Sequence, residues 1–152
     1  MCSSDPTMDP CRLTCVHGEA QVSERHKTWD LLKFVKSSTP HPWVCIGDFN
    51  EVLLREEHRS VAERSNAQIM AFRETVDVCG LSDLGYTGIH WTFEKKVDGG
   101  SFCRVRLDRA LATADWSTRY PLGEVRHLLE VACSDHIPIL LELEPSRDRQ
   151  GP

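Results

Sequence analysis

Two short polar motifs stand at the ends of apolar segments and carry the residue types needed for chemistry on a phosphate. The first, Asp48-Phe-Asn50, follows the apolar run at 43–47, and the second, Asp135-His136, precedes another at 137–143. A carboxylate can hold or deprotonate a water, an amide can donate to a phosphate oxygen, and an imidazole can transfer a proton. Two such motifs at strand ends predict one shared site for chemistry on a phosphate.

The geometry of a strand sharpens the prediction for the first motif. Successive side chains alternate faces, so Asp48 and Asn50 should point the same way while Phe49 enters the core. Each motif also has a purely structural interpretation. Asp and Asn bond their own backbone in turns, and Ser134-Asp-His136 taken alone is an ordinary loop.

A third element, Arg106-Leu-Asp-Arg109, places a carboxylate between two arginines. In a strand Asp108 would face opposite to its neighbours Leu107 and Arg109, where it could accept a hydrogen bond from a histidine and fix the ring's tautomer. The alternative is a solvated ion cluster. The joint occurrence of all three elements, in this order and at strand ends, favours an active site.

Composition limits how the chain could bind nucleic acid. It has 152 residues, 40% of them hydrophobic and 27% charged, with a net charge of −5. These values are typical of one globular domain. A negative chain has no bulk attraction to nucleic acid, so such binding requires a local patch or a metal.

The chain shows neither a membrane span nor a secretory signal, because its apolar runs are short and its first residues are polar. Seven cysteines favour a reducing compartment, with Cys45 and Cys79 buried as thiols. We therefore expect a nuclear or cytoplasmic protein that is not secreted. Cys11, Cys15 and His17 lack the paired spacing of a zinc site.

Apolar patterning predicts alternating helices and strands. Helices are expected at 24–36 and from Ser65, whose capping box opens the second, to Gly80, with a short helical turn at 115–120. The expected strands are 12–16, 43–47, 90–93, 105–112, 125–131 and 137–143. Residues 51–64 are expected to form a loop, and Asp98-Gly-Gly100 a turn. This order favours an α/β sandwich over residues 12–144, with an irregular start at 1–11 and a frayed tail at 145–152.

These motifs together resemble the endonuclease/exonuclease/phosphatase superfamily. Within it, the chain resembles the apurinic-type endonuclease domain encoded by plant non-LTR retrotransposons, where a reverse transcriptase accompanies the nuclease. The resemblance covers roughly residues 12–143. It rests on W-V-C-I-G-D-F-N-E, R-L-D-R and S-D-H-x-P-I-L-L, together with Phe72 to Gly85, Trp91-Thr-Phe, Leu107 to Leu111 and Trp116.

The resemblance implies a four-layer, two-sheet sandwich of the DNase I-like type that cleaves a phosphodiester of DNA with Mg²⁺, or with Mn²⁺ in its place. By residue, Asp48 would activate the attacking water and bind metal, and Asn50 would contact the phosphate. His136 would stabilise or protonate at the scissile phosphate, Asp108 would orient His136, and Asp135 would be a second metal-proximal carboxylate. No obligate protein partner and no membrane contact are implied.

The chain also departs from the family pattern. It resembles only the C-terminal half of the domain, and the other half carries an Asn motif and the Glu that is the main metal ligand. His17-Gly18 stands where the family usually has tyrosine and glycine, which makes His17 a candidate phosphate contact. We therefore expect a sandwich incomplete at its N-terminal side and weak or absent activity. The alternatives are a noncatalytic retroelement relic or interaction module, and a phosphatase for a small phosphorylated lipid or nucleotide.

Overall fold

The apolar strand predicted at 43–47 forms the centre of a four-stranded sheet. The computed structural model describes residues 10–38, 40–97, 99–128 and 134–144. In it, β2 (Trp43–Asp48) pairs with β1 (Arg12–His17) in parallel and with β7 (Asp108–Thr113) in antiparallel orientation. The short edge strand β4 (Leu81–Asp83) completes the sheet on the far side of β7. β2 therefore ends where β7 begins, at one end of the sheet.

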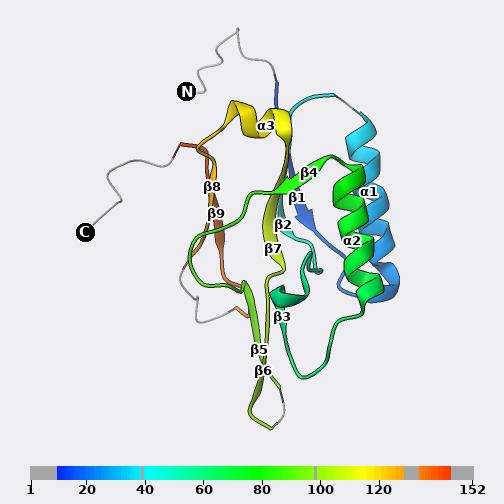
Figure 1. Cartoon of the computed structure of the whole chain (residues 1–152), viewed down its shortest axis with the longest axis vertical. Helices are drawn as coiled ribbons and strands as arrows, with labels where there is room; N and C mark the ends of the chain where they lie inside the picture. Colours follow the sequence, from blue (N-terminus) through cyan, green and yellow to red (C-terminus); the bar gives the residue numbers. More distant parts are fainter. Residues whose placement is uncertain (1–9, 39, 98, 129–133, 145–152) are drawn as a thin grey trace, which may run out of the picture.

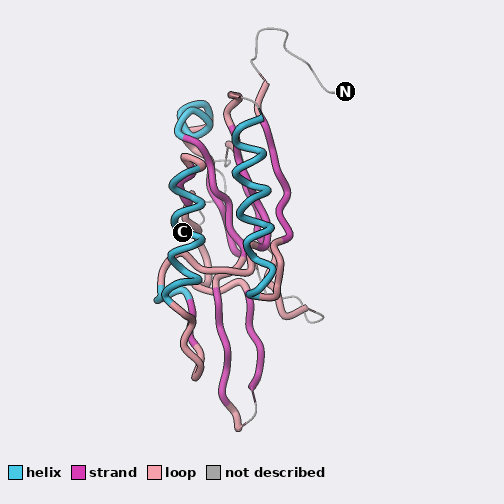
Figure 2. The backbone as a smooth tube through the Cα atoms, turned by 90° about the vertical axis from the view of Figure 1, so that its right-hand side faces the viewer, coloured by secondary structure: helices cyan, strands magenta, loops and turns pink. Residues whose placement is uncertain are grey.

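Two helices cover one face of this sheet (Figures 1 and 2). The first, α1 (Arg25–Ser38), follows a short 3-10 turn at Val22–Glu24, and the second is α2 (Asn66–Val78). The Ser65 hydroxyl caps α2 by accepting a hydrogen bond from the Ala67 amide at 3.2 Å. Apolar side chains fill the space between helices and sheet, and Trp29 stacks on Phe72 with ring centroids 4.6 Å apart. Both predicted helices are thus confirmed.

The other face of the sheet carries a smaller second sheet. It consists of β8 (Glu124–His127) and β9 (Ile139–Glu142), and the short α3 (Ala114–Arg119) packs at its end. Val44, Ala110, Trp116 and Val125 are buried between these parts. The predicted mixed α/β architecture with more than one sheet is confirmed. The described residues form no helical layer outside the second sheet.

A β-hairpin projects beyond the body of the molecule (Figures 1 and 2). It comprises β5 (Phe93–Val97) and β6 (Ser101–Val105), and β6 also pairs with β3 (His58–Arg59). Two predictions were wrong here. The strand expected at 90–93 lies at Phe93–Val97, and the single strand expected at 105–112 is two strands. The chain leaves the hairpin sheet at Val105 and enters the four-stranded sheet at Asp108, with a buried two-residue link between them.

Several element boundaries differ from the sequence predictions. The expected loop at 51–64 contains a 3-10 turn, Arg55–Glu57, followed by β3. The strand expected at 125–131 is observed as Glu124–His127, and residues 129–133 lie outside the described residues, as do 1–9 and 145–152. Cys45 and Cys79 are fully buried, as predicted. Within the described residues, no helix is both long enough and apolar enough to cross a membrane.

Candidate active site

Three of the predicted site residues converge at the end of the sheet where β2 ends and β7 begins. Asp48, the last residue of β2, is the direct cross-strand partner of Asp108, the first residue of β7. His136 reaches the same place from the turn before β9. One ligand atom from each side chain lies within 4.8 Å of the other two. The sequence places these residues far apart, and the antiparallel pairing of β2 with β7 brings the carboxylates together.

The imidazole of His136 lies between the two carboxylates. Its Nδ1 atom is 2.9 Å from Oδ2 of Asp108, and its Nε2 atom is 3.7 Å from Oδ2 of Asp48. The ring of Phe93 packs edge-on against the imidazole, with centroids 5.2 Å apart. The side chain of His136 is 36% exposed, so solvent or substrate can reach it. The hydrogen-bond contact expected between Asp108 and His136 is therefore present.

The motif Asp48-Phe-Asn50 forms a tight turn and presents polar groups at the same time. Oδ1 of Asp48 accepts a hydrogen bond from the Asn50 amide at 2.8 Å, which is the turn chemistry considered as an alternative. Asn50 adopts a positive φ of 53°, and its side-chain nitrogen donates to the carbonyl oxygen of Gly18 at 2.6 Å. Phe49 is fully buried, as predicted. Turn and candidate site therefore coexist in these residues.

Glycine is required beside Asp48 because strand β1 approaches closely. Gly47 has φ 147°, and a Cβ atom there would lie 2.0 Å from the carbonyl oxygen of Val16. A side chain at this position would separate β1 from β2. The glycine therefore keeps His17, the partner of Asp48 across these strands, next to the site. The side chain of His17 is exposed there.

The electrostatics of Asp48 differ from those of a surface carboxylate. Burial raises the pKa of Asp48, the nearby charge of Asp108 raises it further, and the hydrogen bond from Asn50 and the two histidines oppose the rise. When Asp48 is ionised beside a second carboxylate, the surrounding positive charge therefore does not fully compensate the two negative charges. Such a carboxylate can accept a proton or a cation.

Asp135, the second predicted metal ligand, lies on the turn that carries His136. Its backbone carbonyl oxygen accepts a hydrogen bond from the amide of Glu94 at 3.0 Å, and its side chain is exposed. Within the described part of the chain, its carboxylate is outside the three-residue donor group. The metal-binding role of Asp135 stays a prediction.

A buried ion network supports the candidate site and was missed by the sequence analysis. The carboxylate of Glu51 has no exposed surface and pairs with Arg25 of α1 and, at 3.1 Å, with Arg64. The guanidinium of Arg64 also donates to the carbonyl oxygen of Asn50 at 3.1 Å. Arg25 donates to the carbonyl oxygens of Glu19 and, at 3.1 Å, Ala20. The network thus connects residues 19–20, which follow the Gly18 carbonyl bound by Asn50, to the loop that carries Arg64.

The two arginines beside Asp108 do not form the solvated cluster considered as an alternative. Arg109 is fully buried and donates to Asp83 at 2.8 Å and to Glu57 at 2.7 Å, and Arg106 makes two 2.8 Å bonds to Asp83. These arginines lower the pKa of Asp83 against the opposing effect of burial. Asp108 is therefore free to face His136 while its neighbours connect β7 to β4 and the 55–57 turn.

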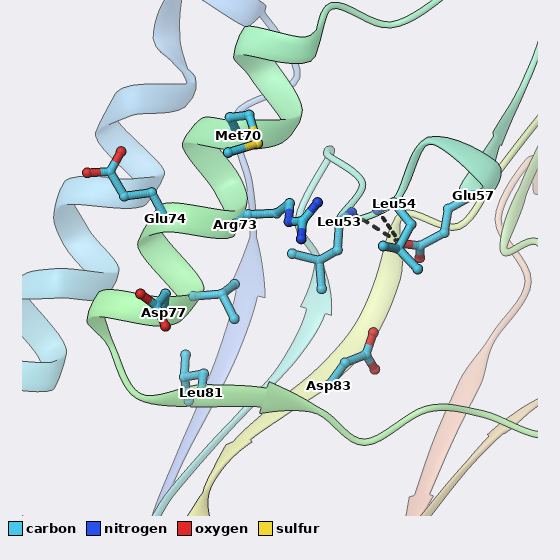
Figure 3. Close-up of a pocket in the computed structure, with 10 residues that line it drawn as sticks. Leu53, Leu54, Glu57, Met70, Arg73, Glu74, Asp77, Leu81 and Asp83 are labelled. Carbon is cyan, nitrogen blue, oxygen red and sulfur yellow. Dashed lines mark hydrogen bonds between the residues drawn. The ribbon is translucent and has the colours of Figure 1, made fainter.

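A groove of about 640 Å³ lies beside α2, away from the candidate site (Figure 3). Leucine side chains line it together with Glu57, Glu74, Asp77 and Asp83, against one cation, Arg73. In Figure 3 the oxygen of Glu57 is held by the backbone amides of residues 53 and 54. Glu57 and Asp83 are paired with Arg106 and Arg109. The remaining charges, Glu74 and Asp77 against Arg73, leave the groove without the excess of positive charge that would attract a nucleic-acid strand.

Comparison with known proteins defines the class of this chain. A family model described as "Endonuclease/Exonuclease/phosphatase family" matches residues 6–136, and the chain belongs to this family. No curated protein sequence matches it. The three converging residues all lie within the matched range.

Solved structures share the fold at low sequence identity. The 3′-5′ exonuclease NExo from Neisseria meningitidis is 20% identical with a TM-score of 0.66, covering 87% of this chain and 60% of that one. A structure of the 3′ phosphatase NExo from Neisseria bound to a product DNA hairpin gives 19% and 0.65 over 88% and 61%. The endonuclease domain of TRAS1, a telomere-specific non-LTR retrotransposon, gives 20% and 0.58 over 76% and 50%. The chain spans about 60% of the length of the NExo structures.

Proposed function

We propose that this chain carries the phosphodiester-cleaving centre of a DNA endonuclease, derived from a retroelement. The observation that carries the proposal is the imidazole of His136, hydrogen-bonded to one carboxylate and facing another across 3.7 Å. The family membership and the similarity to nuclease structures support this reaction class. The similarity to the TRAS1 domain supports the retroelement origin, and a plant source remains part of the proposal.

In the proposed mechanism His136 acts through its Nε2 atom. Asp108 accepts the Nδ1 hydrogen and thereby fixes the ring's orientation and stabilises the imidazolium. Nε2 faces Asp48 at 3.7 Å, and in this scheme it donates a proton to an oxygen of the scissile phosphate bound beside it. Asp108 is a positioning residue in this scheme, since it acts through His136.

Asp48 and Asn50 act on the water and the phosphate in the same scheme. Oδ1 of Asp48 accepts a hydrogen bond from the backbone N–H of Asn50, so Oδ2 remains to accept a proton from the attacking water. The water oxygen bonds to phosphorus as the bond from phosphorus to the leaving sugar oxygen breaks. Asn50 uses one side-chain N–H for Gly18, and the second is available for a phosphate oxygen. His17, beside Asp48 on β1, is a further proposed phosphate contact.

The donor set fits a hard divalent cation. Two carboxylates and an imidazole lie within 4.8 Å of one another, and Mg²⁺ is held in enzymes by one or two carboxylates while keeping several waters. We propose that Asp48, a member of this group, would hold Mg²⁺ or Mn²⁺, and that Asp135, whose carboxylate lies outside the group, would be a second carboxylate near the ion. The ion would supply countercharge for the phosphate oxygens.

A plasmid-nicking assay tests the proposed function. Supercoiled DNA is incubated with this chain, and with a version extended upstream in the encoding sequence, in Mg²⁺ and in EDTA. Mg²⁺-dependent nicking by either protein that disappears in the variant His136→Ala supports the proposal. If neither protein nicks DNA, the noncatalytic alternative replaces it.

A further inference from the structure

A second concave site lies next to the candidate active site, on the segment that follows Asn50. It is a pocket of about 330 Å³. Arg55, Arg59, Ser60 and Arg64 line it, with Glu63 as its acidic member. It adjoins the candidate site through Arg64, whose guanidinium donates to the carbonyl oxygen of Asn50 at 3.1 Å. The pocket is therefore attached to the loop that presents the proposed phosphate-binding amide.

The charge of this pocket is positive although the chain as a whole is negative. Three arginines face one glutamate, and the side chain of Glu63 is 87% exposed and 3.7 Å from Arg55. Arg64 shares Glu51 with Arg25, so that carboxylate is already neutralised from two sides. Among the described residues, Arg59 is exposed and has no ion-pair partner. An unpaired arginine in a polar concavity favours binding of an anion.

The strand pairing at Arg59 adds a second, independent observation. Arg59 of β3 is the direct antiparallel partner of Arg104 of β6. Like charges placed opposite each other across two strands are destabilising. Arg104 is partly compensated by Glu94 at 3.3 Å, whereas Arg59 has no such carboxylate among the described residues. An anion bound between pocket and strand would remove this repulsion.

We infer that this pocket binds a backbone phosphate of the nucleic-acid strand, outside the scissile position. The inference rests on the proposed function and identifies where a chain of net charge −5 obtains its attraction for DNA. Arginine forks match the paired oxygens of a phosphate, and Ser60 adds a hydroxyl. His58, whose pKa is lowered by burial and by Arg64, contributes no charge at neutral pH. Arg55 and Arg59 are therefore the exposed cations that recognise the strand.

Fluorescence anisotropy of a short labelled DNA duplex, titrated with the 152-residue chain in EDTA, tests this site separately from cleavage. Arg59→Ala and Arg55→Ala should each weaken binding, by roughly two- to fivefold per arginine for exposed ion pairs. Each should also reduce the slope of log K against log salt by about 0.9, the value for one lost contact to duplex phosphate. Arg59→Lys should keep the salt slope and lose part of the affinity, because lysine retains the charge without the guanidinium fork. Arg73→Ala, which removes an exposed arginine from the acidic groove, is the matched control.

The outcomes separate this inference from the proposed function. If the pocket variants bind like Arg73→Ala, or if the chain does not bind the duplex, the phosphate site is wrong, whatever the nicking assay shows. Duplex binding that depends on Arg55 and Arg59 without any nicking supports the pocket and rejects the proposed catalysis. Calorimetry with inorganic phosphate forms the last arm. Binding of free phosphate that depends on Arg59, with unchanged duplex affinity, also overturns the assignment to a nucleic-acid strand.

Discussion

Asp48 and Asp108 lie directly opposite each other at the end of an antiparallel strand pair, with a histidine facing both. Two carboxylates in this position repel each other, and the imidazole of His136 is the nearest group that can take positive charge. A fold selected for stability alone would place an opposite charge or an apolar pair here. The arrangement is therefore better explained by what it binds than by what it contributes to folding.

Replacing Asp48 by asparagine should stabilise the protein at neutral pH while reducing activity. Burial raises the pKa of Asp48 in the folded state above its ordinary value of 3.8. The folded state then binds more protons than the unfolded state. The free energy of unfolding therefore falls as the pH rises from 3.8 through the higher pKa that Asp48 has in the folded state. Asn is neutral at every pH and escapes this loss. Urea unfolding in EDTA should give a larger free energy of unfolding for Asp48→Asn than for the wild type at neutral pH. The difference should disappear below pH 3.8.

A difference that stays constant across this pH range, or that favours the wild type at neutral pH, would contradict the assigned electrostatics. The asparagine side chain keeps an oxygen that can accept the Asn50 amide, so the turn itself should survive.

The pair formed by His136 and Asp108 should control cleavage without controlling folding. In a chain that nicks DNA, His136→Ala should lower the rate about a hundredfold to ten-thousandfold, the range for a lost acid or base. Asp108→Asn should also cause a large loss, because the ring would no longer be oriented and stabilised. Rates of plasmid nicking, measured with circular dichroism melts of the same variants, check both effects.

Asp115→Asn supplies the control for these carboxylate substitutions. Asp115 stands at the start of α3, where its carboxylate accepts from the Trp116 amide at 2.9 Å. It has no contact with His136 and should leave the nicking rate unchanged. A loss of activity in this variant equal to that of Asp108→Asn would mean that the rates report folding instead of chemistry.

The sequence predicted those elements whose burial is one-sided or complete. The helices and β2 were predicted because their apolar residues follow the period of the element they form. The hairpin was misplaced because Glu94, Lys95 and Lys96 lie in a strand that projects from the body, where no buried face imposes alternation. The break before Asp108 was missed since Val105 to Ala112 is largely buried on both sides of it.

The candidate site was predictable to a similar extent. Asp48, Asp108 and His136 were identified from residue types at strand ends together with a family resemblance, and their convergence followed from strand pairing. The network of Arg25, Glu51 and Arg64 had no such signal. Its members belong to a helix, to the turn after β2 and to a loop, and sequence spacing does not specify which charges meet in three dimensions.

The 152-residue chain should bind Mg²⁺ weakly, with a dissociation constant above the micromolar range. Mg²⁺ gives up its waters reluctantly and needs well-placed carboxylates. Here Asp48 has one free oxygen, and the side chain of Asp135 lies outside the donor group. Isothermal titration calorimetry measures the constant, with Asp48→Ala expected to abolish the heat. Micromolar binding would show that these residues form a complete site and would remove the reason to expect impaired activity.

Glu51→Gln should strongly destabilise the fold. Removing the carboxylate deprives Arg25 and Arg64, both largely buried, of the counterion that they share. Removing one partner of a buried ion pair costs about 3–5 kcal/mol. Urea unfolding provides the free energy of unfolding. Glu63→Gln is the control, since its side chain is 87% exposed and should change stability by about 0.5 kcal/mol or less. Equal effects of the two substitutions would show that the network does not hold the Asn50 loop.

The exposed face of β1 should make the isolated chain associate. Leu13 and Cys15 pair with Val44 and Ile46 across the strands and share their face of the sheet, yet Leu13 is 62% exposed. β1 is also an edge strand, whose open backbone groups can pair with another copy. Light scattering after size-exclusion chromatography, under reducing conditions, should show mass rising with concentration. Leu13→Lys should suppress the rise, whereas Leu31→Lys, at a 61% exposed position on α1, should not. A monodisperse monomer that melts cooperatively would mean that the second sheet already closes this face, and the predicted incomplete sandwich would be wrong.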